Sequence, residues 1–163
     1  MNKRISMQSE KLLDQLKTVR QASCEKRQIV YVEGLRGAAS AYFLSRLHQL
    51  EKGRPILIVT NCQMRSELIM EDLKYFLNHL SLKTNPQYFP PWGFVPYEEV
   101  TPDNEVFGER LEVLNRLRNG ENLFMVVPVE SIMQMVSPIS WLDKKIFKIR
   151  ANDQLEQELL EAS

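Results

Sequence analysis

The chain has 163 residues, of which 44% are hydrophobic and 26% are charged, as is typical of one ordinary globular domain. Its 21 lysines and arginines balance 21 aspartates and glutamates, so net charge provides no positive field that would hold a nucleic acid. The two cysteines, Cys24 and Cys62, are far apart in the sequence. Their spacing argues against a zinc site or a disulfide framework and fits thiols in a reducing cytosol.

Nothing in the sequence indicates secretion or a membrane. The first residues include two basic side chains with no apolar run behind them, so they do not form a signal peptide. No run approaches the roughly 18 apolar residues that a membrane span needs. We expect a cytoplasmic chain with no membrane contact.

The first part of the chain predicts alternating helices and strands. Apolar residues at helical spacing predict a helix over residues 7–20, and a β-branched apolar run predicts a buried strand over residues 28–32. A helix over about residues 38–52 follows, with Gly53 as its expected left-handed end. The continuous apolar run over residues 55–60 is typical of a strand covered on both faces and favours a parallel sheet.

The alternation continues through the middle of the chain. A helix is predicted over residues 63–80, with Asn61 as its N-cap, and a short strand over residues 87–89. The next helix is predicted over residues 103–118, with Thr101 before a proline as the expected N-cap.

The last part of the chain adds one buried strand and several shorter elements. We expect Met133 and Met135, together with Ile132, to fill core space. The remaining predicted elements are a strand over residues 123–127, short helices over 129–136 and 138–143, a strand over 146–149, and a helix from 152 to the end. The pattern as a whole predicts an α/β fold with an open, mostly parallel sheet flanked by helices. Ligands of such sheets bind at the carboxyl ends of the strands.

A glycine-rich turn follows the first buried strand, in the strand–turn–helix context of a P-loop. A working P-loop has glycine, four residues, and then Gly-Lys-Ser/Thr. Counting from Gly34, these last three positions hold Ala39, Ser40 and Ala41, so the lysine is missing and Ser40 stands one place away from the metal-binding hydroxyl. The sequence therefore predicts a degenerate phosphate loop, made of Gly34, Gly37, Ala39 and Ser40. We expect it to bind no cofactor.

A proline-rich connector over residues 89–102 carries the aromatic residues Trp92 and Tyr97 next to Pro96. Its four prolines fix an extended path, and rigid aromatics on an exposed loop are typical of interfaces. The connector is therefore either a ledge that binds a partner or a loop that packs on its own domain. Arg110, on the following helix, is either a surface charge or a pair for an upstream carboxylate.

The sequence offers no catalytic or metal-binding cluster. Its acidic residues between Glu98 and Glu109 have no histidine nearby, and the two histidines, His48 and His79, lie on predicted helices. Such carboxylates are ordinarily solvated groups at helix starts. We expect neither a catalytic residue nor a metal site.

Taken in order, several motifs resemble the N-terminal region of the bacterial transcription-repair coupling factor, or Mfd, family. The similarity covers about residues 30–160. The motifs are the degenerate loop at Gly34, Glu71-Asp72-Leu73-Lys74-Tyr75-Phe76-Leu77, Phe89-Pro90-x-Trp92, Pro96-Tyr97-Glu98, Thr101-Pro102, Glu109-Arg110-Leu111-x-x-Leu114, Val127-Pro128-Val129, Met133-Gln134 and Pro138.

This resemblance implies a fold similar to the first domain of UvrB, a RecA-like unit whose nucleotide site has decayed. It divides the chain into an N-terminal helix and connection (residues 1–27), the UvrB-like domain (28–150) and the start of a UvrA-binding subdomain (151–163), whose UvrA contacts fall largely past Ser163.

The implied function is a non-catalytic scaffold module that supports UvrA recruitment in transcription-coupled nucleotide excision repair. Its partners would be UvrA and the other domains of the full-length protein, without sequence-specific DNA binding. The family's ATP-dependent motor domains are not among these residues. Two alternatives stay open: a diverged P-loop NTPase in which Arg36 replaces the lysine, and a free-standing adaptor that uses the Trp92–Tyr97 ledge.

Overall fold

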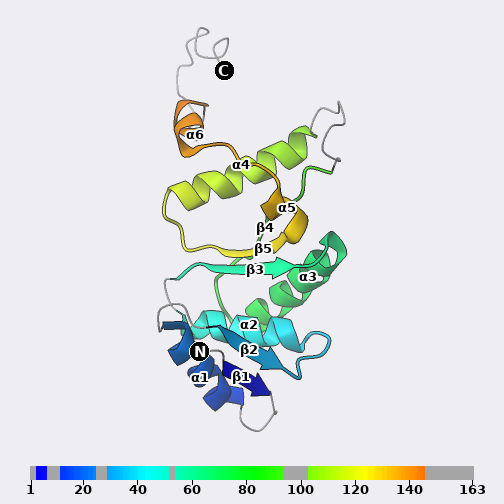
Figure 1. Ribbon diagram of the computed structural model, residues 1–163, viewed down its shortest axis with the longest axis vertical. Coiled ribbons are helices and arrows are strands. Elements are labelled where there is room, and N and C mark those ends of the chain that lie inside the picture. Colours follow the sequence, from blue (N-terminus) through cyan, green and yellow to red (C-terminus); the bar gives the residue numbers. More distant parts are fainter. Residues whose placement is uncertain (1–2, 7–11, 25–28, 52–53, 94–102, 146–163) are drawn as a thin grey trace. The chain divides into compact units, whose positions relative to one another are not determined.

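A computed structural model describes residues 3–6, 12–24, 29–51, 54–93 and 103–145 (Figure 1). The chain divides into two compact units, residues 1–133 and 134–163. Within the described residues, the second unit contains one helix, α6 (Ile139–Lys145). The strand predicted over 146–149, the final helix, the boundary at residue 150, and the connector residues Pro96 and Tyr97 lie outside the described residues.

A two-stranded parallel sheet begins the first unit. Strand β1 (Lys3–Ser6) pairs with β2 (Val30–Glu33), with Lys3 opposite Val30. No strand was predicted over residues 3–6, because Lys-Arg-Ile-Ser has no apolar run and is a strand only through its pairing with β2.

Two helices pack against this small sheet. Helix α1 (Leu12–Cys24) begins and ends later than the predicted 7–20. Helix α2 (Ala39–Leu50) has Glu51 as its C-cap, and the predicted end at Gly53 lies outside the described residues. Their buried side chains Leu16, Val19 and Phe43 form one hydrophobic cluster, against which Val30 and Val32 of β2 pack.

The larger sheet has three parallel strands, in the order β3-β5-β4. They are β3 (Ile56–Thr60), β4 (Gln87–Tyr88) and β5 (Phe124–Pro128). Every strand pair in the described part of the chain is parallel, which confirms the predicted open parallel sheet flanked by helices.

Helices cover both faces of β5, which is why all five of its residues are buried. On one face Phe124 and Val126 pack with Leu73 and Leu77 of α3 (Gln63–His79). On the other face Met125 and Val127 pack with residues of α4 (Asn104–Arg118). This two-sided burial is the reason that the sequence of β5 is continuously apolar.

Asp103, rather than the predicted Thr101, caps α4: its carboxylate accepts a hydrogen bond of 2.9 Å from the backbone N–H of Glu105. The N-cap of α3 is Cys62, which makes no side-chain cap bond, so Asn61 was also a wrong prediction. At the other end of α4 the C-cap is Asn119, followed by Gly120 at a φ of +74°, the left-handed conformation that often ends a helix.

A substitution at the N-cap of α4 tests whether this helix begins after Asp103. Replacing Asp103 with alanine is expected to lower the free energy of unfolding by about 1 kcal/mol, because the first turn of α4 loses its only side-chain acceptor at the cap position. Urea denaturation followed by far-UV circular dichroism measures this. The matched change Asn61→Ala should have almost no effect, since Asn61 caps nothing.

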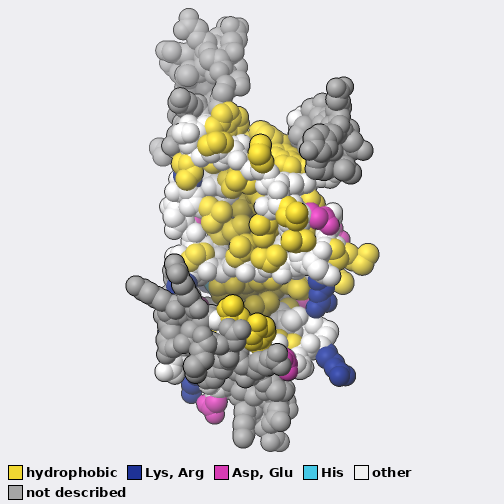
Figure 2. Space-filling view, in the orientation of Figure 1, with side chains coloured by type: hydrophobic (Ala, Val, Ile, Leu, Met, Phe, Trp, Pro, Cys, Tyr) yellow, Lys and Arg dark blue, Asp and Glu magenta, His cyan; other side chains and the backbone are white. Residues whose placement is uncertain are grey.

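Several apolar side chains remain exposed on the larger sheet and beside it. On β3, Leu57 and Val59 are 57% and 53% exposed, because α4 covers the neighbouring strand and not β3. On α5 (Val129–Met133), Ile132 and Met133 are also exposed. Figure 2 shows hydrophobic side chains gathered over the part of this face that runs from α4 to β3.

The expectation that Ile132, Met133 and Met135 fill core space was therefore wrong. Met133 is 81% exposed in the first unit, and Met135 is 91% exposed in the second. Their apolar character is not explained by packing inside either unit.

Candidate functional site

The turn after β2 has the backbone of a tight glycine loop. Gly34 and Gly37 lie at φ values of +87° and +54°, a region that residues with a β-carbon rarely adopt. A β-carbon built on Gly37 would meet no atom within 4 Å. Gly37 is thus required by its backbone angle and not by a close neighbour.

Two polar groups of this turn are hydrogen-bonded inside it. The backbone N–H of Ala39 donates to the carbonyl of Arg36 at 3.1 Å, and the Ser40 hydroxyl donates to the carbonyl of Gly37 at 3.3 Å. Arg36 itself is exposed. The start of α2 has no side-chain cap, and a bare helix N-terminus contributes only about 0.3–1 kcal/mol toward an anion. The turn therefore has little to offer a phosphate.

A second candidate site is the buried cation Arg110, whose residue is 1% exposed. Its Nη1 donates to the carbonyl of Pro90 at 2.5 Å. Its guanidinium carbon lies 4.2 Å from the ring centroid of Phe89 and 4.3 Å from that of Trp92. Burial lowers the pKa of Arg110 to about 10, so the side chain still carries its charge at neutral pH. Of the two alternatives that the sequence left open for Arg110, the surface charge is therefore wrong.

These contacts form what we name the Arg110 clasp: Phe89, Pro90, Trp92, Phe107 and Arg110. Phe107 and Arg110 are three residues apart on α4, and the ring of Phe107 stacks on that of Trp92 at a centroid distance of 6.0 Å. The clasp fastens the start of the connector to α4. In the described part of the connector, Trp92 thus packs on its own unit.

The carboxyl edge of the larger sheet, where ligands of α/β proteins bind, holds hydroxyl groups. Thr60 Oγ1 and Ser66 Oγ are hydrogen-bonded at 2.5 Å and buried. Burial, and then the negative charges of Glu67, Glu130 and Glu109, raise the pKa of Tyr88 to about 12. A phenol with this pKa stays protonated, and no imidazole is hydrogen-bonded to Thr60 or Ser66 among the described residues. These groups do not make an activated nucleophile.

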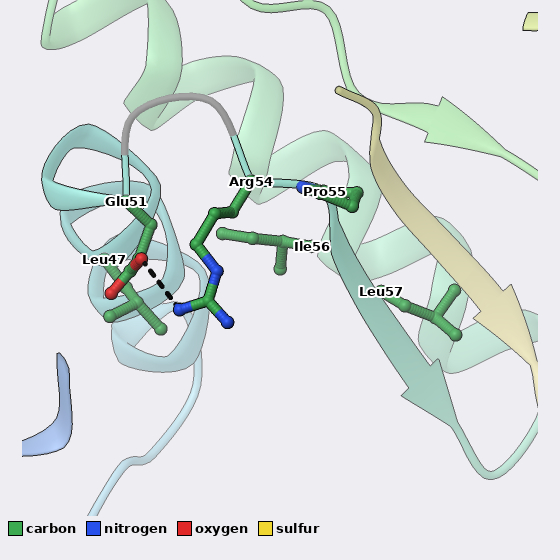
Figure 3. Close-up of a pocket in the computed structure, with 6 residues that line it drawn as sticks. All are labelled: Leu47, Glu51, Arg54, Pro55, Ile56 and Leu57. Atoms are coloured by element: carbon green, nitrogen blue, oxygen red, sulfur yellow. Dashed lines mark hydrogen bonds and ion pairs between the residues drawn. The ribbon is translucent and has the colours of Figure 1, made fainter. Parts of the chain in front are cut away.

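A cavity of about 260 Å³ lies at the opposite, amino end of β3 (Figure 3). The carboxylate of Glu51 is nearly buried and lies 3.4 Å from Nη1 of Arg54 and 3.6 Å from Nε of Arg20. Figure 3 shows the Arg54 side chain reaching across the cavity toward Glu51. The cavity is lined by Leu47, Glu51, Arg54, Pro55, Ile56 and Leu57. The one carboxylate in its lining, that of Glu51, is neutralised by two arginines. We therefore interpret this site as a structural ion-pair cluster that ties α1 to the end of α2.

His48 also lies away from the carboxyl edge. Its Nε2 is 2.9 Å from the Thr84 hydroxyl, just before β4, and its ring stacks on Phe124 at 4.8 Å. Burial lowers the pKa of His48 below its ordinary value. Among the described residues, no group of three or more His, Cys, Asp or Glu side chains could hold a metal ion. No described helix is long and apolar enough to cross a membrane.

The position of His48 predicts a pH dependence of stability. Because the folded state holds His48 neutral, the unfolded state binds a proton first as the pH falls, and stability should fall below the ordinary histidine pKa of about 6.5. Urea denaturation at about pH 8 and about pH 5.5 measures the difference. His48→Phe should reduce this difference, because it removes the titrating group. His79→Phe, at an exposed position, should leave it unchanged, and an equal reduction by both substitutions would contradict the account.

Sequence reasoning found the glycine turn and singled out Trp92 and Arg110, but it missed the roles of Phe89, His48 and Tyr88. The spacing of Arg110 from the apolar positions Val106 and Leu114, one turn away on each side, was a usable signal that Arg110 faces inward. Nothing local indicated that rings from the connector would flank its guanidinium.

Comparison with known proteins gives a consistent set of relatives. Over 127 residues, this chain is 28% identical to the transcription-repair-coupling factor of Bacillus subtilis (strain 168). The aligned region covers 78% of the chain and 10% of the relative. The transcription-repair-coupling factors of Myxococcus xanthus and Escherichia coli (strain K12) are 26% and 24% identical, over 82% and 77% of the chain.

The chain therefore spans about a tenth of the length of the curated relatives it matches. No protein-family model matches the chain, and no solved structure matches it.

Proposed function

Because the chain belongs to the transcription-repair coupling factor family, we propose that it is a non-catalytic scaffold module that supports UvrA recruitment in transcription-coupled nucleotide excision repair. The observation that carries this proposal is the turn after β2. It has the strand–turn–helix context of a phosphate loop, but it has no lysine, and the Ser40 hydroxyl and Ala39 amide are hydrogen-bonded within the turn.

We propose that residues 28–150 form a domain similar to the first domain of UvrB, RecA-like and with a degenerate P-loop. The parallel strands and their flanking helices fit this proposal. The hydroxyls at the carboxyl edge of the larger sheet do not supply a second catalytic site, because Tyr88 is held protonated and Ser66 is bonded to Thr60. On this proposal the chain is a cytoplasmic module that hydrolyses no ATP.

The open surfaces of the two sheets support packing against other domains of a longer protein. Among the described residues, β2 pairs only with β1, and β3 pairs only with β5. Helix α2 connects β2 to β3, and its Leu44 packs against both the Leu16–Phe43 cluster and the α3 cluster. Parallel sheets are normally covered on both faces and protected at their edges. We propose that other segments of the polypeptide cover the exposed face of β3 and the apolar residues of α5.

On this proposal UvrA is contacted through the subdomain that begins at about residue 151, and the module positions that subdomain. A segment exchange in the Bacillus subtilis relative tests it. A chimera carrying this chain in place of the matching 127 residues is expected to keep its capture of purified UvrA, measured by biolayer interferometry, and its strand-specific repair.

Deleting the same segment from the relative should lower both readouts. Capture and repair that persist undiminished after the deletion would contradict a scaffold role. ATP hydrolysis by the chain on its own would contradict the non-catalytic role.

A further inference from the structure

Helix α3 carries an apolar stripe on its outer surface. Its buried side chains Ile69, Leu73 and Leu77 face the sheet. Met64, Leu68 and Tyr75 are 71%, 50% and 67% exposed. At about 100° of rotation per residue, these three positions fall on nearly one line along the helix, opposite the buried face.

Part of this stripe is held in place before any partner arrives. The ring of Tyr75 lies edge-on to Phe76 at a centroid distance of 5.2 Å and stacks on His79 at 6.2 Å with an angle of 6°. Tyrosine is a common anchor at interfaces, because a ring that is already ordered loses little entropy on binding. Met64 adds an adaptable side chain at the other end of the stripe.

Acidic side chains flank the stripe. Glu67 and Glu71 lie on one side of it and Asp72 on the other, where Arg65 lies beside Asp72, while Lys74 lies further round toward the buried face. Gln63 Nε2 donates to the Glu67 carboxylate at 2.9 Å, which orders one of these groups. With three carboxylates and one arginine on its flanks, the net charge around the three apolar side chains is negative.

We propose that this stripe is a docking surface for a basic amphipathic helix of a partner protein. Met64 to Tyr75 spans about 16 Å along the helix axis, or about three turns, which matches the contact length of a second helix packed along the first. A partner with apolar residues on one side and lysine or arginine on either flank would complement Glu67, Glu71 and Asp72. This surface is separate from the turn after β2 and from the exposed face of β3.

The proposal is tested with the full chain and a synthetic amphipathic helical peptide of about fourteen residues, built from leucine and lysine. Fluorescence anisotropy should give saturable binding of this peptide. Glu71→Lys and the double substitution Met64→Ser/Leu68→Ser should each weaken it by about tenfold. The matched controls are Glu112→Lys and Leu117→Ser, at exposed positions on α4, and they should stay within about twofold of the parent chain.

A peptide with glutamate in place of each lysine should not bind. Equal binding by the α3 variants and the parent chain, or no binding of the basic peptide, would overturn the proposal. Self-association that Met64→Ser/Leu68→Ser abolishes, seen by analytical ultracentrifugation, would assign the stripe to a second copy of the chain and would also overturn it. Circular dichroism confirms that each variant is folded.

Discussion

Replacing Arg110 with alanine is expected to lower the free energy of unfolding by about 3 kcal/mol. The substitution removes the charge that stacks on Phe89 and Trp92 and the donor to the carbonyl of Pro90. A desolvated cation–π contact contributes about 2 kcal/mol, and a hydrogen bond from a charged group about 1.5–3 kcal/mol, partly offset by the cost of burying the guanidinium. Urea denaturation followed by circular dichroism measures the change.

Two further variants make the Arg110 result specific. Arg110→Lys keeps the charge but loses the planar guanidinium that stacks between rings, so it should also be clearly destabilised. Arg65→Ala, which removes an exposed arginine on α3, should change stability by less than about 0.5 kcal/mol. If Arg110→Ala were as mild as Arg65→Ala, the clasp would not fasten the connector to α4.

The second large effect is expected on α3. Leu73→Ala should lower the free energy of unfolding by about 2–5 kcal/mol, because Leu73 is fully buried in the cluster that joins α3 to Phe124 and Val126. Leu68→Ala removes the same atoms from the exposed side of the same helix. Apart from the small difference in helix propensity between leucine and alanine, it should lower the free energy of unfolding by less than about 0.5 kcal/mol.

Chemical denaturation of the two leucine variants measures this contrast directly. Similar losses at Leu68 and Leu73 would show that Leu68 is packed in solution, and would remove it from the docking stripe. The expected contrast would instead leave Leu68 as an apolar group with no role in stability.

Elements with strong local periodicity were predictable from the sequence. The helix predicted over residues 63–80 is observed as α3, Gln63–His79. The strand predicted over residues 55–60 is observed as β3, Ile56–Thr60. The parallel arrangement also followed from the continuous apolar character of these strands. In such segments one or both faces are buried within the same unit, so the local spacing of apolar residues is enough to predict the helix or strand.

What depended on distant contacts could not be predicted. Strand β1 exists through pairing with β2, and the burial of Arg110 depends on the rings of Phe89 and Trp92, which come from the connector before α4. The N-cap of α4 is Asp103 and not Thr101, because the helix begins at Asn104. The prediction that Met133 and Met135 fill core space was wrong because an apolar side chain need not be buried within its own unit. Both residues are exposed in their units.

The scaffold account joins these observations. Among the described residues, outer strands that each pair on one side only, a clasp that fixes the start of the connector, and a glycine turn without a P-loop lysine are the features that support the proposed scaffold role. The account depends on the turn after β2, because a functional loop there would make the chain a nucleotide-binding domain.

Isothermal titration calorimetry of the chain with Mg-ATP tests this most directly. Since Gly34 to Ser40 lacks the lysine and uses the Ala39 amide and the Ser40 hydroxyl within the turn, the titration should give only heats of dilution. Saturable binding at micromolar concentrations, abolished by Arg36→Ala, would contradict the account and assign the turn to a diverged nucleotide site.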